Sequence, residues 1–501
     1  MLRSLPVFVV LLAVGLLASA AFGTGWIGQR RVNAPNDSVS DCQPCLAVDS
    51  FGNPWVVWGA RRRSADTSLF YARWQGDTWQ PGRGVGPNAF GVPTRLRPSL
   101  AFDQFNVAWA VWNNGYADTV TNIGSSRYVG GAWGPEVLVN VFDSTDFDFA
   151  PRVACGGGQV WCVWYGGPTD MSPYSVFASR WYDSAGFWYP EMQVSPPDST
   201  YHWWCDLAVD ANGTPHVVWC NSDRRLICYS YYDGDAWVAP IAVNDTAAVG
   251  ATSWADPHVA TDNAGILQVC YTGVAQGATG RDIFYSRNDG TGWTPSVRVT
   301  SDTAHNYNEW YSDIAADRPD NVWVAWDRQG EGSDGFRVYA AHYDGSEWSS
   351  EERLDNDTAY YDGGAAVCLD GNGCPWVVWD GITYGAYEDV FYNRYLPSGS
   401  LEHEPHIARP EALRLAVTSP ARNQARFSFL TTQTCQVSLE VYDISGRRIG
   451  HVVDGVLPAG QHSATWEARL TDGGRVPAGA YFGCLEAAGF SEKCKFTLLS
   501  D

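Results

Sequence analysis

Lysine is almost absent from this chain of 501 residues, because Lys493 and Lys495 are its two lysines and arginine carries the rest of the positive charge. Lysine and arginine together number 33 against 55 aspartates and glutamates, which gives a formal net charge of −22 at pH 7. A chain of this charge repels phosphate backbones and anionic lipid headgroups. The composition therefore argues against nucleic-acid binding and against electrostatic docking to a membrane.

Long hydrophobic runs are also missing, apart from the apolar segment Val7 to Leu17. This segment follows Arg3 and precedes the small residues at 18–20, the pattern of a secretory signal peptide. A membrane anchor is the alternative, but about 20 apolar residues are needed to span a bilayer. We expect residues 1–23 to be a signal peptide and the remainder to be exported, with no membrane span.

Charged residues make up only 18% of the chain, whereas hydrophobic residues make up 45%. This ratio excludes a disordered chain and leaves ample material for a core. The chain contains 25 Trp, 25 Tyr and 51 Gly, which favour strands and tight turns over helices. The expected fold class is all-β.

Thirteen cysteines follow the export signal, so disulfides are expected in an oxidising compartment. Three close pairs flank glycine-containing turns, where each could bridge neighbouring strands: Cys155/Cys162, Cys368/Cys374 and Cys484/Cys494. Cys42-Gln-Pro-Cys45 has the spacing of a redox or metal motif, but a zinc site needs four ligands and no second pair accompanies it. We therefore expect no metal and no cofactor.

A repeat organises most of the chain. Each copy has a short apolar strand ending at an Asp position, followed nine residues later by an aromatic residue, with Cys155 replacing the Asp in the third copy. The copies recur about every 54 residues, which is the spacing of propeller blades. The seven aromatic positions are Trp58, Trp112, Trp164, Trp219, Tyr271, Trp326 and Trp379.

Each copy also predicts a third strand, such as Phe70 to Arg73, and a fourth strand headed by tryptophan, such as Trp79. Four strands in about 50 residues are typical of one β-propeller blade. We therefore predict a seven-bladed β-propeller over residues 24–400, with six or eight blades as the alternatives.

The seventh copy lacks its fourth strand. The segment Trp26 to Asn33, before the first copy, matches Trp133 to Asn140 and Trp237 to Asn244, each with Asn seven residues after Trp. We predict that this N-terminal strand completes the last blade, closing the ring and removing an exposed sheet edge.

Two turns between third and fourth strands, Ser286 to Trp293 and Ser230 to Trp237, resemble the Asp-boxes of sialidase-like, BNR-repeat propellers. Ser, Gly and Trp match, while the Asp is replaced by Asn288 or Tyr232. The resemblance implies a propeller fold, and it raises sialidase activity as an alternative. Phe90 to Pro93 resembles that family's Phe-Arg-Ile-Pro motif but lacks the arginine.

The C-terminal residues 415–501 are predicted to form a second domain. Residues 401–414 read as a linker, and residues 415–501 alternate as strands of a small antiparallel, Ig-like β-sandwich. The motifs Val441 to Arg448, Leu457 to His462 and Val476 to Phe482 resemble the C-terminal sorting domains of type IX secretion and related hook-capping Ig-like modules. This resemblance implies secretion machinery as a partner and a secreted or cell-surface location in a bacterium with an outer membrane. An ordinary Ig-like spacer is the alternative.

Loops that meet on one face of a propeller commonly bind ligands, because a rigid scaffold presents them. In this chain those loops combine aromatic rings with carboxylates, which suits an extracellular glycan or protein. The recurrence of Trp-x-x-Asp in copies four and six also allows a packing role between blades. The candidate ligand-binding residues are Trp203, Trp204, Trp254, Asp256, Glu309, Trp310, Tyr311 and Asp313.

Residues that recur in most copies are interpreted as structural: the arginines near the ends of five third strands should stack on aromatic rings, and the hairpin aspartates of six copies should cap their own turns. The leading hypothesis is an exported, non-catalytic binding protein. The alternative is a glycoside hydrolase of the sialidase or another type, for which Glu309 with Asp256 or Asp313 could supply paired carboxylates. A structural surface-layer component without a ligand is the third hypothesis.

Overall fold

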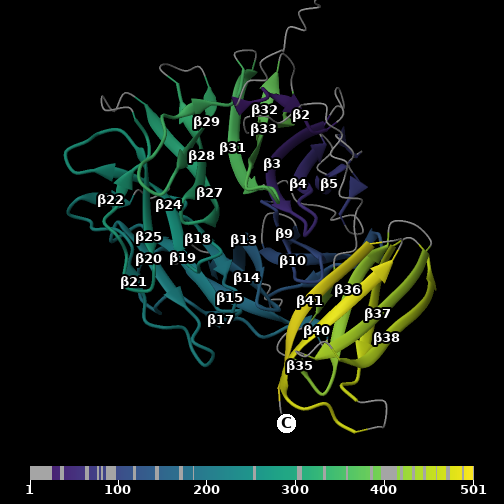
Figure 1. The fold of residues 1–501 in the computed structure, drawn as a ribbon. Helices are drawn as coiled ribbons and strands as arrows, with labels where there is room; N and C mark the ends of the chain where they lie inside the picture. The colour runs from purple at the N-terminus through teal and green to yellow at the C-terminus, as the bar shows by residue number, and fades with distance from the viewer. Residues whose placement is uncertain are drawn as a thin grey trace, which may run out of the picture.

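The computed structural model describes residues 25–33, 39–62, 67–75, 78–80, 83–85, 97–116, 120–140, 146–168, 173–183, 186–251, 255–301, 307–330, 335–356, 359–383, 387–396, 415–417, 421–431, 435–443, 447–458, 460–469, 474–487 and 490–499. All regular secondary structure in these ranges is β-strand, which confirms the all-β prediction for the described residues (Figure 1). Across the same ranges no helix is long and apolar enough to cross a membrane. The expected signal peptide, the linker at 401–414 and Trp254 lie outside the described residues.

Within residues 25–396, we group the described strands along the chain into seven successive units, which we number 1 to 7; the strands within each unit pair antiparallel, and units 2 and 3 are joined into one ten-stranded sheet by the parallel pairing of β10 with β13 at Thr121 and Phe147. Unit 1 consists of β3 (Val39–Val48), β4 (Pro54–Arg62), β5 (Thr67–Gln75), β6 (Thr78–Trp79) and β7 (Arg83–Gly84). Unit 2 consists of β8 (Ser99–Phe102), β9 (Ala108–Tyr116), β10 (Val120–Val129), β11 (Ala132–Trp133) and β12 (Val137–Leu138). Unit 3 consists of β13 (Asp146–Gly156), β14 (Gln159–Pro168), β15 (Ser175–Tyr182), β16 (Phe187–Trp188) and β17 (Met192–Gln193).

The remaining units continue the same order. Unit 4 consists of β18 (His202–Val209), β19 (Pro215–Asn221), β20 (Leu226–Tyr231) and β21 (Ile241–Ala242). Unit 5 consists of β22 (Val249–Ala251), β23 (His258–Thr261), β24 (Leu267–Ala275), β25 (Asp282–Asn288) and β26 (Val297–Arg298). Unit 6 consists of β27 (Asn308–Arg318), β28 (Asn321–Gln329), β29 (Phe336–Tyr343) and β30 (Glu352–Arg353). Unit 7 consists of β31 (Ala359–Leu369), β32 (Pro375–Thr383) and β33 (Asp389–Leu396).

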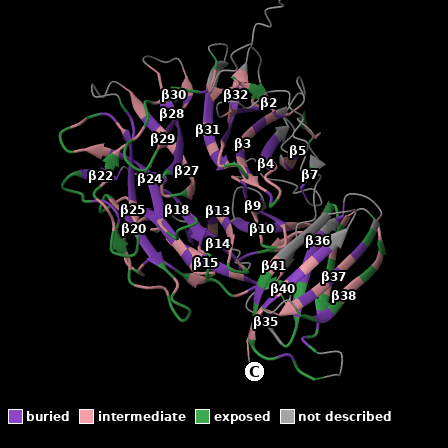
Figure 2. Ribbon diagram, in the orientation of Figure 1, coloured by how far each residue is buried: buried purple, intermediate pink, exposed green. Residues whose placement is uncertain are grey.

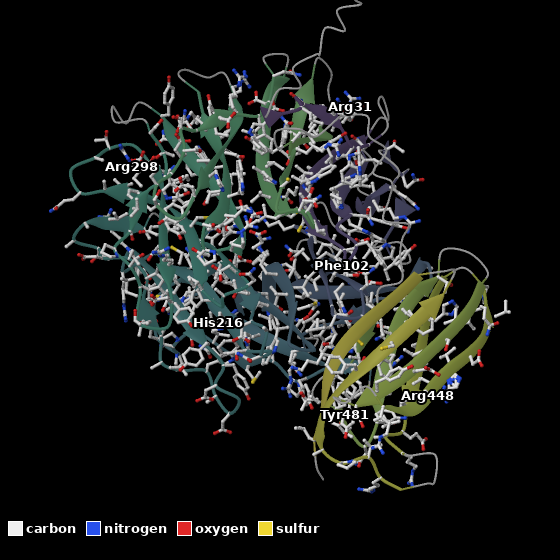
Figure 3. The ribbon with its side chains drawn as sticks, viewed as in Figure 1. Arg31, Phe102, His216, Arg298, Arg448 and Tyr481 are labelled. Atoms are coloured by element: carbon white, nitrogen blue, oxygen red, sulfur yellow. The ribbon has the colours of Figure 1, made fainter. Side chains whose placement is uncertain are left out.

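The N-terminal strands β1 (Gly25–Trp26) and β2 (Arg30–Arg31) pair with β33, so the pairing expected from the sequence is present. Trp26 lies opposite Tyr395, and its ring centroid is 5.7 Å from those of Trp323 and Tyr395. Arg31, labelled in Figure 3, forms an ion pair with Asp389 at 3.1 Å. The start of the repeat region is thereby fixed to its end.

The innermost strands of the units contact one another in sequence. β3 contacts β8, β8 contacts β13, and the series continues through β18, β23, β27 and β31 until β31 contacts β3. The units are therefore arranged around a common centre, the hub, onto which their first strands face (Figure 1).

The core lies between neighbouring units. One apolar cluster joins Val57 of β4 to Ala110 of β9, and another joins Val56 of β4 to Val378 of β32. The central strands are buried along most of their length, as Figure 2 shows for β14 and β28. Because both faces of these strands are covered, their sequences read as continuous apolar runs rather than as alternating ones.

The recurring residues have the structural roles expected from their repetition. Asp49 Oδ1 accepts hydrogen bonds from the backbone N–H groups of Phe51 and Asn53, both at 2.9 Å. The guanidinium groups of the recurring arginines lie over aromatic rings, for example Arg73 over Trp55 at 5.7 Å. These contacts confirm the interpretation as turn caps and cation–π pairs.

The C-terminal region forms two sheets packed around one apolar core. The first contains β34 (Ala416–Val417), β36 (Ala425–Thr431) and β39 (Gly460–Trp466). The second contains β35 (Ala421–Arg422), β37 (Cys435–Asp443), β38 (Arg448–Leu457), β40 (Gly479–Ala487) and β41 (Phe490–Leu499). The amide Nε2 of Gln461 donates to the carbonyl oxygen of Phe105 in unit 2 at 2.8 Å, which connects the two regions.

The strand register corrects one expectation about disulfides. Cys484 lies opposite Lys493 and Cys494 lies opposite Gly483, so the two cysteines point to opposite faces of the sheet and cannot bridge. Cys155, Cys162, Cys368 and Cys374 are free thiols in the structure.

Candidate functional site

A residue with a left-handed backbone occurs at one equivalent position of every unit, and these seven positions recur at the period of the repeat. Left-handed φ values are uncommon outside glycine, and clusters of them mark functional or strained sites. In units 1, 3, 4, 6 and 7 the residue lies at a β-bulge, where the register between first and second strands shifts. The residues are Gln43 (φ 54°), Arg97 (38°), Ala150 (46°), Trp204 (51°), Asp256 (37°), Tyr311 (44°) and Gly364 (67°).

Two residues after each of these seven left-handed positions, a second set of side chains faces the hub. Its seven members all line a single cavity of about 370 Å³. They vary in chemistry although their place in the repeat is the same: Cys45, Ser99, Arg152, Asp206, His258, Asp313 and Ala366. We call this set the hub ring.

The cavity has two different walls. Units 3 to 6 contribute the charged members of the hub ring, together with Asp256 and Tyr311. The wall formed by β3 and β31 consists mainly of small or apolar side chains, among them Cys45, Gly364 and Ala365. Burial raises the pKa of the Cys45 thiol to about 11, so it stays protonated at neutral pH.

His258 is the centre of the charged wall. Its Nδ1 lies 3.0 Å from Asp313 Oδ1 and 3.5 Å from Asp206 Oδ2, and its Nε2 lies 3.7 Å from Asp256 Oδ1. Burial lowers the pKa of His258, but these three carboxylates outweigh burial and raise it to about 10. The imidazole is therefore held as a cation at neutral pH.

Arg152 extends the network beside His258. Its Nε lies 3.5 Å from Asp206 Oδ1, and its Nη2 lies 3.4 Å from His258 Nε2. Burial raises the pKa of Asp206 against the opposing effects of His258 and Arg152, whereas at Asp256 the interactions with His258 and Arg152 together outweigh burial and lower the pKa. Neighbouring carboxylates in the cavity thus have pKa values shifted in opposite directions.

Hub-ring side chains also tie adjacent units together, which fixes their positions. The Val259 N–H donates to Asp206 Oδ2 at 2.8 Å, and the Val367 N–H donates to Asp313 Oδ2 at 2.8 Å. The Val153 N–H donates to Ser99 Oγ at 3.1 Å. The charged groups therefore face the cavity from a rigid frame, as a preorganised site requires.

The structure brings three of the predicted site residues together. Asp256, Tyr311 and Asp313 line the cavity, and Asp256 and Asp313 both contact His258. Trp204 is buried, with the Arg97 guanidinium 4.3 Å above its ring, and Arg97 itself lines the cavity.

The other predicted residues lie elsewhere. Trp310 is half-buried beneath the Arg281 guanidinium at 3.7 Å, and Trp203 packs half-buried between units 3 and 4. Glu309 is buried and accepts from Arg328 Nε at 2.7 Å. Burial raises the pKa of Glu309 to about 8 against the effect of Arg328.

Glu309 is not among the residues that line the cavity, so it does not face Asp256 or Asp313 there. Sequence reasoning also missed Arg97, Arg152 and His258 as site residues. The available signal was chemical variation at one fixed offset in the repeat, thirteen residues before the recurring aromatic in most copies. A search for residue types shared by all copies overlooks repeat positions at which the residue type changes from copy to copy.

The cavity can hydrogen-bond a polyhydroxylated ligand from its charged wall while its small-residue wall leaves room for a ring. The described residues contain no cluster of His, Cys, Asp and Glu side chains arranged to hold a metal ion.

No protein-family model and no curated protein matches the chain. Solved structures similar to it include an ulvan lyase of a polysaccharide lyase family, with 10% identity, 74% of this chain and 96% of the other covered, and a TM-score of 0.49. An α-L-arabinanase of Penicillium chrysogenum has 11% identity, 75% and 99% coverage, and a TM-score of 0.44. The NanB sialidase of Streptococcus pneumoniae has 10% identity, 74% and 70% coverage, and a TM-score of 0.41. None of these similarities transfers an activity to this chain.

Proposed function

We propose that this chain is an exported seven-bladed β-propeller whose hub cavity binds an extracellular glycan without catalysis. The observation that carries the proposal is the hub ring: one repeat position, varied into Arg152, Asp206, His258 and Asp313 on one wall and small residues on the other. Structural positions of a repeat stay alike, as the recurring turn aspartates do. Chemical variation at the repeat position that lines the cavity is therefore best explained by ligand recognition.

The contacts of the carboxylates favour binding over catalysis. Asp206 and Asp313 each accept a backbone N–H of the next unit and also contact His258, so both are held as acceptors. A general acid must instead carry a proton that it can donate to a ligand in the cavity, so these contacts do not suit Asp206 or Asp313 to that role.

A glycoside hydrolase is the second candidate, and one observation favours it. The opposite pKa shifts of Asp206 and Asp256 are the pattern by which two carboxylates divide acid and base roles.

A glycan array read with wild type, His258→Gln and Asp256→Asn tests the binding proposal. His451→Gln, in the C-terminal region and 43% exposed, is the matched control. We expect wild type and the control to retain the same glycans and both hub variants to lose at least about tenfold in affinity, the equivalent of 1.4 kcal/mol. Hub variants that bind as wild type does would refute the hub as the site.

Aryl glycosides, incubated with the same proteins, test the second candidate. Turnover that disappears in Asp256→Asn would establish a hydrolase. If the array and the aryl glycosides are both blank, the remaining hypothesis is a structural component of a surface layer.

Residues 1–23 and the Ig-like residues 415–501 are proposed to direct export and outer-membrane sorting, the second through the type IX machinery. The resemblance of the C-terminal motifs to sorting domains supports this role. Deleting residues 415–501 and following the protein in cell fractions tests it, because an unchanged location would contradict a sorting function.

A further inference from the structure

Five partly buried aromatic rings of units 3 and 4 form a connected cluster, which we call the aromatic platform: Phe147, Phe149, Tyr174, Tyr201 and Trp203. Phe147 and Phe149 stack at 5.8 Å between centroids. Tyr174 lies 6.0 Å from Phe149, 6.1 Å from Tyr201 and 6.4 Å from Trp203. The rings of Tyr201 and Trp203 are 5.9 Å apart.

The platform departs from the repeat. Phe147 and Tyr201 occupy the same position of units 3 and 4, as do Phe149 and Trp203, whereas unit 1 carries Ser40 and Cys42 there. The recurring tryptophans of the fourth strands, by contrast, are kept from copy to copy. Unit 6 carries Trp310 at the second position and unit 7 carries Tyr361 at the first, but aromatic residues occupy both positions together in units 3 and 4. This pairing in two adjacent units points to a local role.

A polar network fixes the backbone that carries the platform. Asp198 Oδ1 accepts from Thr200 Oγ1 at 2.6 Å and lies 3.1 Å from His202 Nε2, while its Oδ2 accepts from Arg224 Nη2 at 3.0 Å. His202 Nδ1 accepts from Trp219 Nε1 at 2.9 Å. Every polar atom of the His202 ring is thereby engaged in holding structure.

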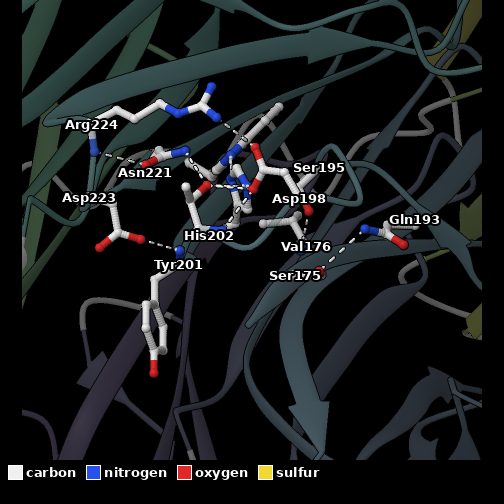
Figure 4. Close-up of polar contacts among 12 residues, drawn as sticks. Ser175, Val176, Gln193, Ser195, Asp198, Tyr201, His202, Asn221, Asp223 and Arg224 are labelled. Atoms are coloured by element: carbon white, nitrogen blue, oxygen red, sulfur yellow. Dashed lines mark hydrogen bonds and ion pairs between the residues drawn. The ribbon is translucent and has the colours of Figure 1, made fainter. Parts of the chain in front are cut away.

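Tyr201 is oriented by the same network. Its backbone N–H donates to Asp223 Oδ2 at 2.7 Å, and Figure 4 shows its phenol pointing away from the hydrogen-bonded cluster around His202. The His202 N–H donates to the Tyr174 carbonyl oxygen at 3.0 Å, which joins units 3 and 4 beneath the rings. The platform is therefore held in place before any ligand binds.

The platform is continuous with the hub cavity. The ring of Tyr165 lies 5.8 Å from Tyr174 on one side and 5.9 Å from Trp204 on the other. Trp204 in turn supports Arg97, a residue of the cavity lining. Contacts through the buried rings of Tyr165 and Trp204 therefore link the platform to the lining of the cavity.

We propose that the aromatic platform is a second subsite, which stacks against a sugar ring of the same glycan whose end occupies the hub. This inference rests on the proposed function and narrows it: the ligand is an oligosaccharide of at least two residues, with an apolar ring face exposed beyond its terminal sugar. Partly buried, rigid rings provide the flat apolar contact that such a face requires at little entropic cost.

The test compares chain lengths. Methyl glycosides and tetrasaccharides of a neutral pentose, a neutral hexose and a uronic acid (arabinose, glucose and galacturonic acid) are titrated into wild type, Tyr201→Ser and Tyr201→Phe by calorimetry. Tyr201→Ser introduces the side chain that unit 1 has at this position, and Tyr201→Phe keeps the ring as the matched control. Trp203→Leu is the second variant, and thermal midpoints establish that each protein is folded.

For the tetrasaccharide that binds, we expect wild type to bind it at least about tenfold more tightly than the methyl glycoside of the same sugar. Tyr201→Ser and Trp203→Leu should lose that gain while binding the methyl glycoside unchanged, and Tyr201→Phe should retain it. His258→Gln should weaken both ligands equally. Equal binding of short and long ligands, or a Tyr201→Ser variant that matches wild type, would overturn the platform alone. Failure of wild type to bind any of the six ligands would overturn the proposed function as well.

Discussion

At the residue scale, the charge on His258 organises the cavity. Three carboxylates and Arg152 surround its ring, so the imidazolium neutralises acidic groups that would otherwise repel one another in a buried space. His202 has the opposite environment, because Trp219 donates to its Nδ1 and the ring must stay neutral to accept. Two buried histidines therefore favour opposite protonation states.

The two histidines should affect the pH dependence of stability with opposite sign. The folded-state pKa of His258, about 10, exceeds the value of about 6.5 in an unfolded chain, so its contribution is complete below about pH 6.5 and is lost as pH rises toward 10. Burial lowers the pKa of His202, so its contribution is complete above about pH 6.5 and is lost as pH falls.

Thermal midpoints of wild type, His258→Gln and His202→Asn across pH 5 to 10 check this prediction. His258→Gln should flatten the alkaline decline, and His202→Asn should flatten the acidic one. An alkaline decline as steep in His258→Gln as in wild type would show that His258 is not the charged group that the carboxylates hold.

The left-handed bulge positions should respond to substitution according to their backbone. At Gly364, with φ +67°, an added Cβ would lie 2.8 Å from Asp380 Oδ1. Gly364→Ala should therefore lower the free energy of unfolding by about 1–3 kcal/mol. Ala150→Gly, at φ 46°, is the matched control and should cause no loss, because relief of left-handed strain offsets the added chain entropy. Denaturant titration measures both changes, and a neutral Gly364→Ala would contradict the strain argument.

Only part of the site could be read from residue types. Asp256, Tyr311 and Asp313 were predicted because carboxylates lie near aromatic residues in segments expected to be loops. The loop assignment was wrong for Tyr311 and Asp313, which lie in strand β27. The same rule selected Glu309, which accepts a hydrogen bond from Arg328 within unit 6. Arg152 and His258 sit in apolar strand sequences that carry no motif, and their meeting depends on how neighbouring units face the hub.

At the element scale, the N-terminal strands hold the last unit. The Asn33 side chain joins them to unit 7 as well, because Oδ1 accepts from the Val390 N–H at 3.2 Å and Nδ2 donates to Asp389 Oδ1 at 3.0 Å. The sequence predicted this pairing from the Trp-to-Asn spacing alone. The bulges could not be predicted, since the identities of Gln43, Trp204 and Tyr311 give no sign of a positive φ.

Deleting residues 25–33 should lower the thermal midpoint sharply, because the deletion uncovers the edge of β33. Trp26→Ala should lower the free energy of unfolding by about 2–3 kcal/mol, less than a fully buried tryptophan loses. Trp79→Ala, which removes the tryptophan at the outer edge of unit 1, is the matched comparison for the loss of one packed ring. Calorimetric melting measures these changes. An unchanged melting curve in the deletion protein would show that the N-terminal strands do not secure the ring.

At the scale of the whole molecule, the ring of contacts between innermost strands brings seven distant positions of the chain to one cavity. A repeat can thus keep its turn aspartates and stacked arginines for folding while it varies one position for recognition. The repeat predicted the units and their order, because its period is regular. The repeat could not predict the cavity, because residues at the same repeat position come together only when the units are arranged around the hub.

The most direct measurement is a crystal structure of the full chain with a glycan that the array retains. The hub hypothesis predicts electron density for the terminal sugar between His258 and the small residues of β31, with hydrogen bonds to Asp256 or Arg152. Density confined to the outer strands or to the C-terminal region, with the hub cavity holding only water, would contradict it.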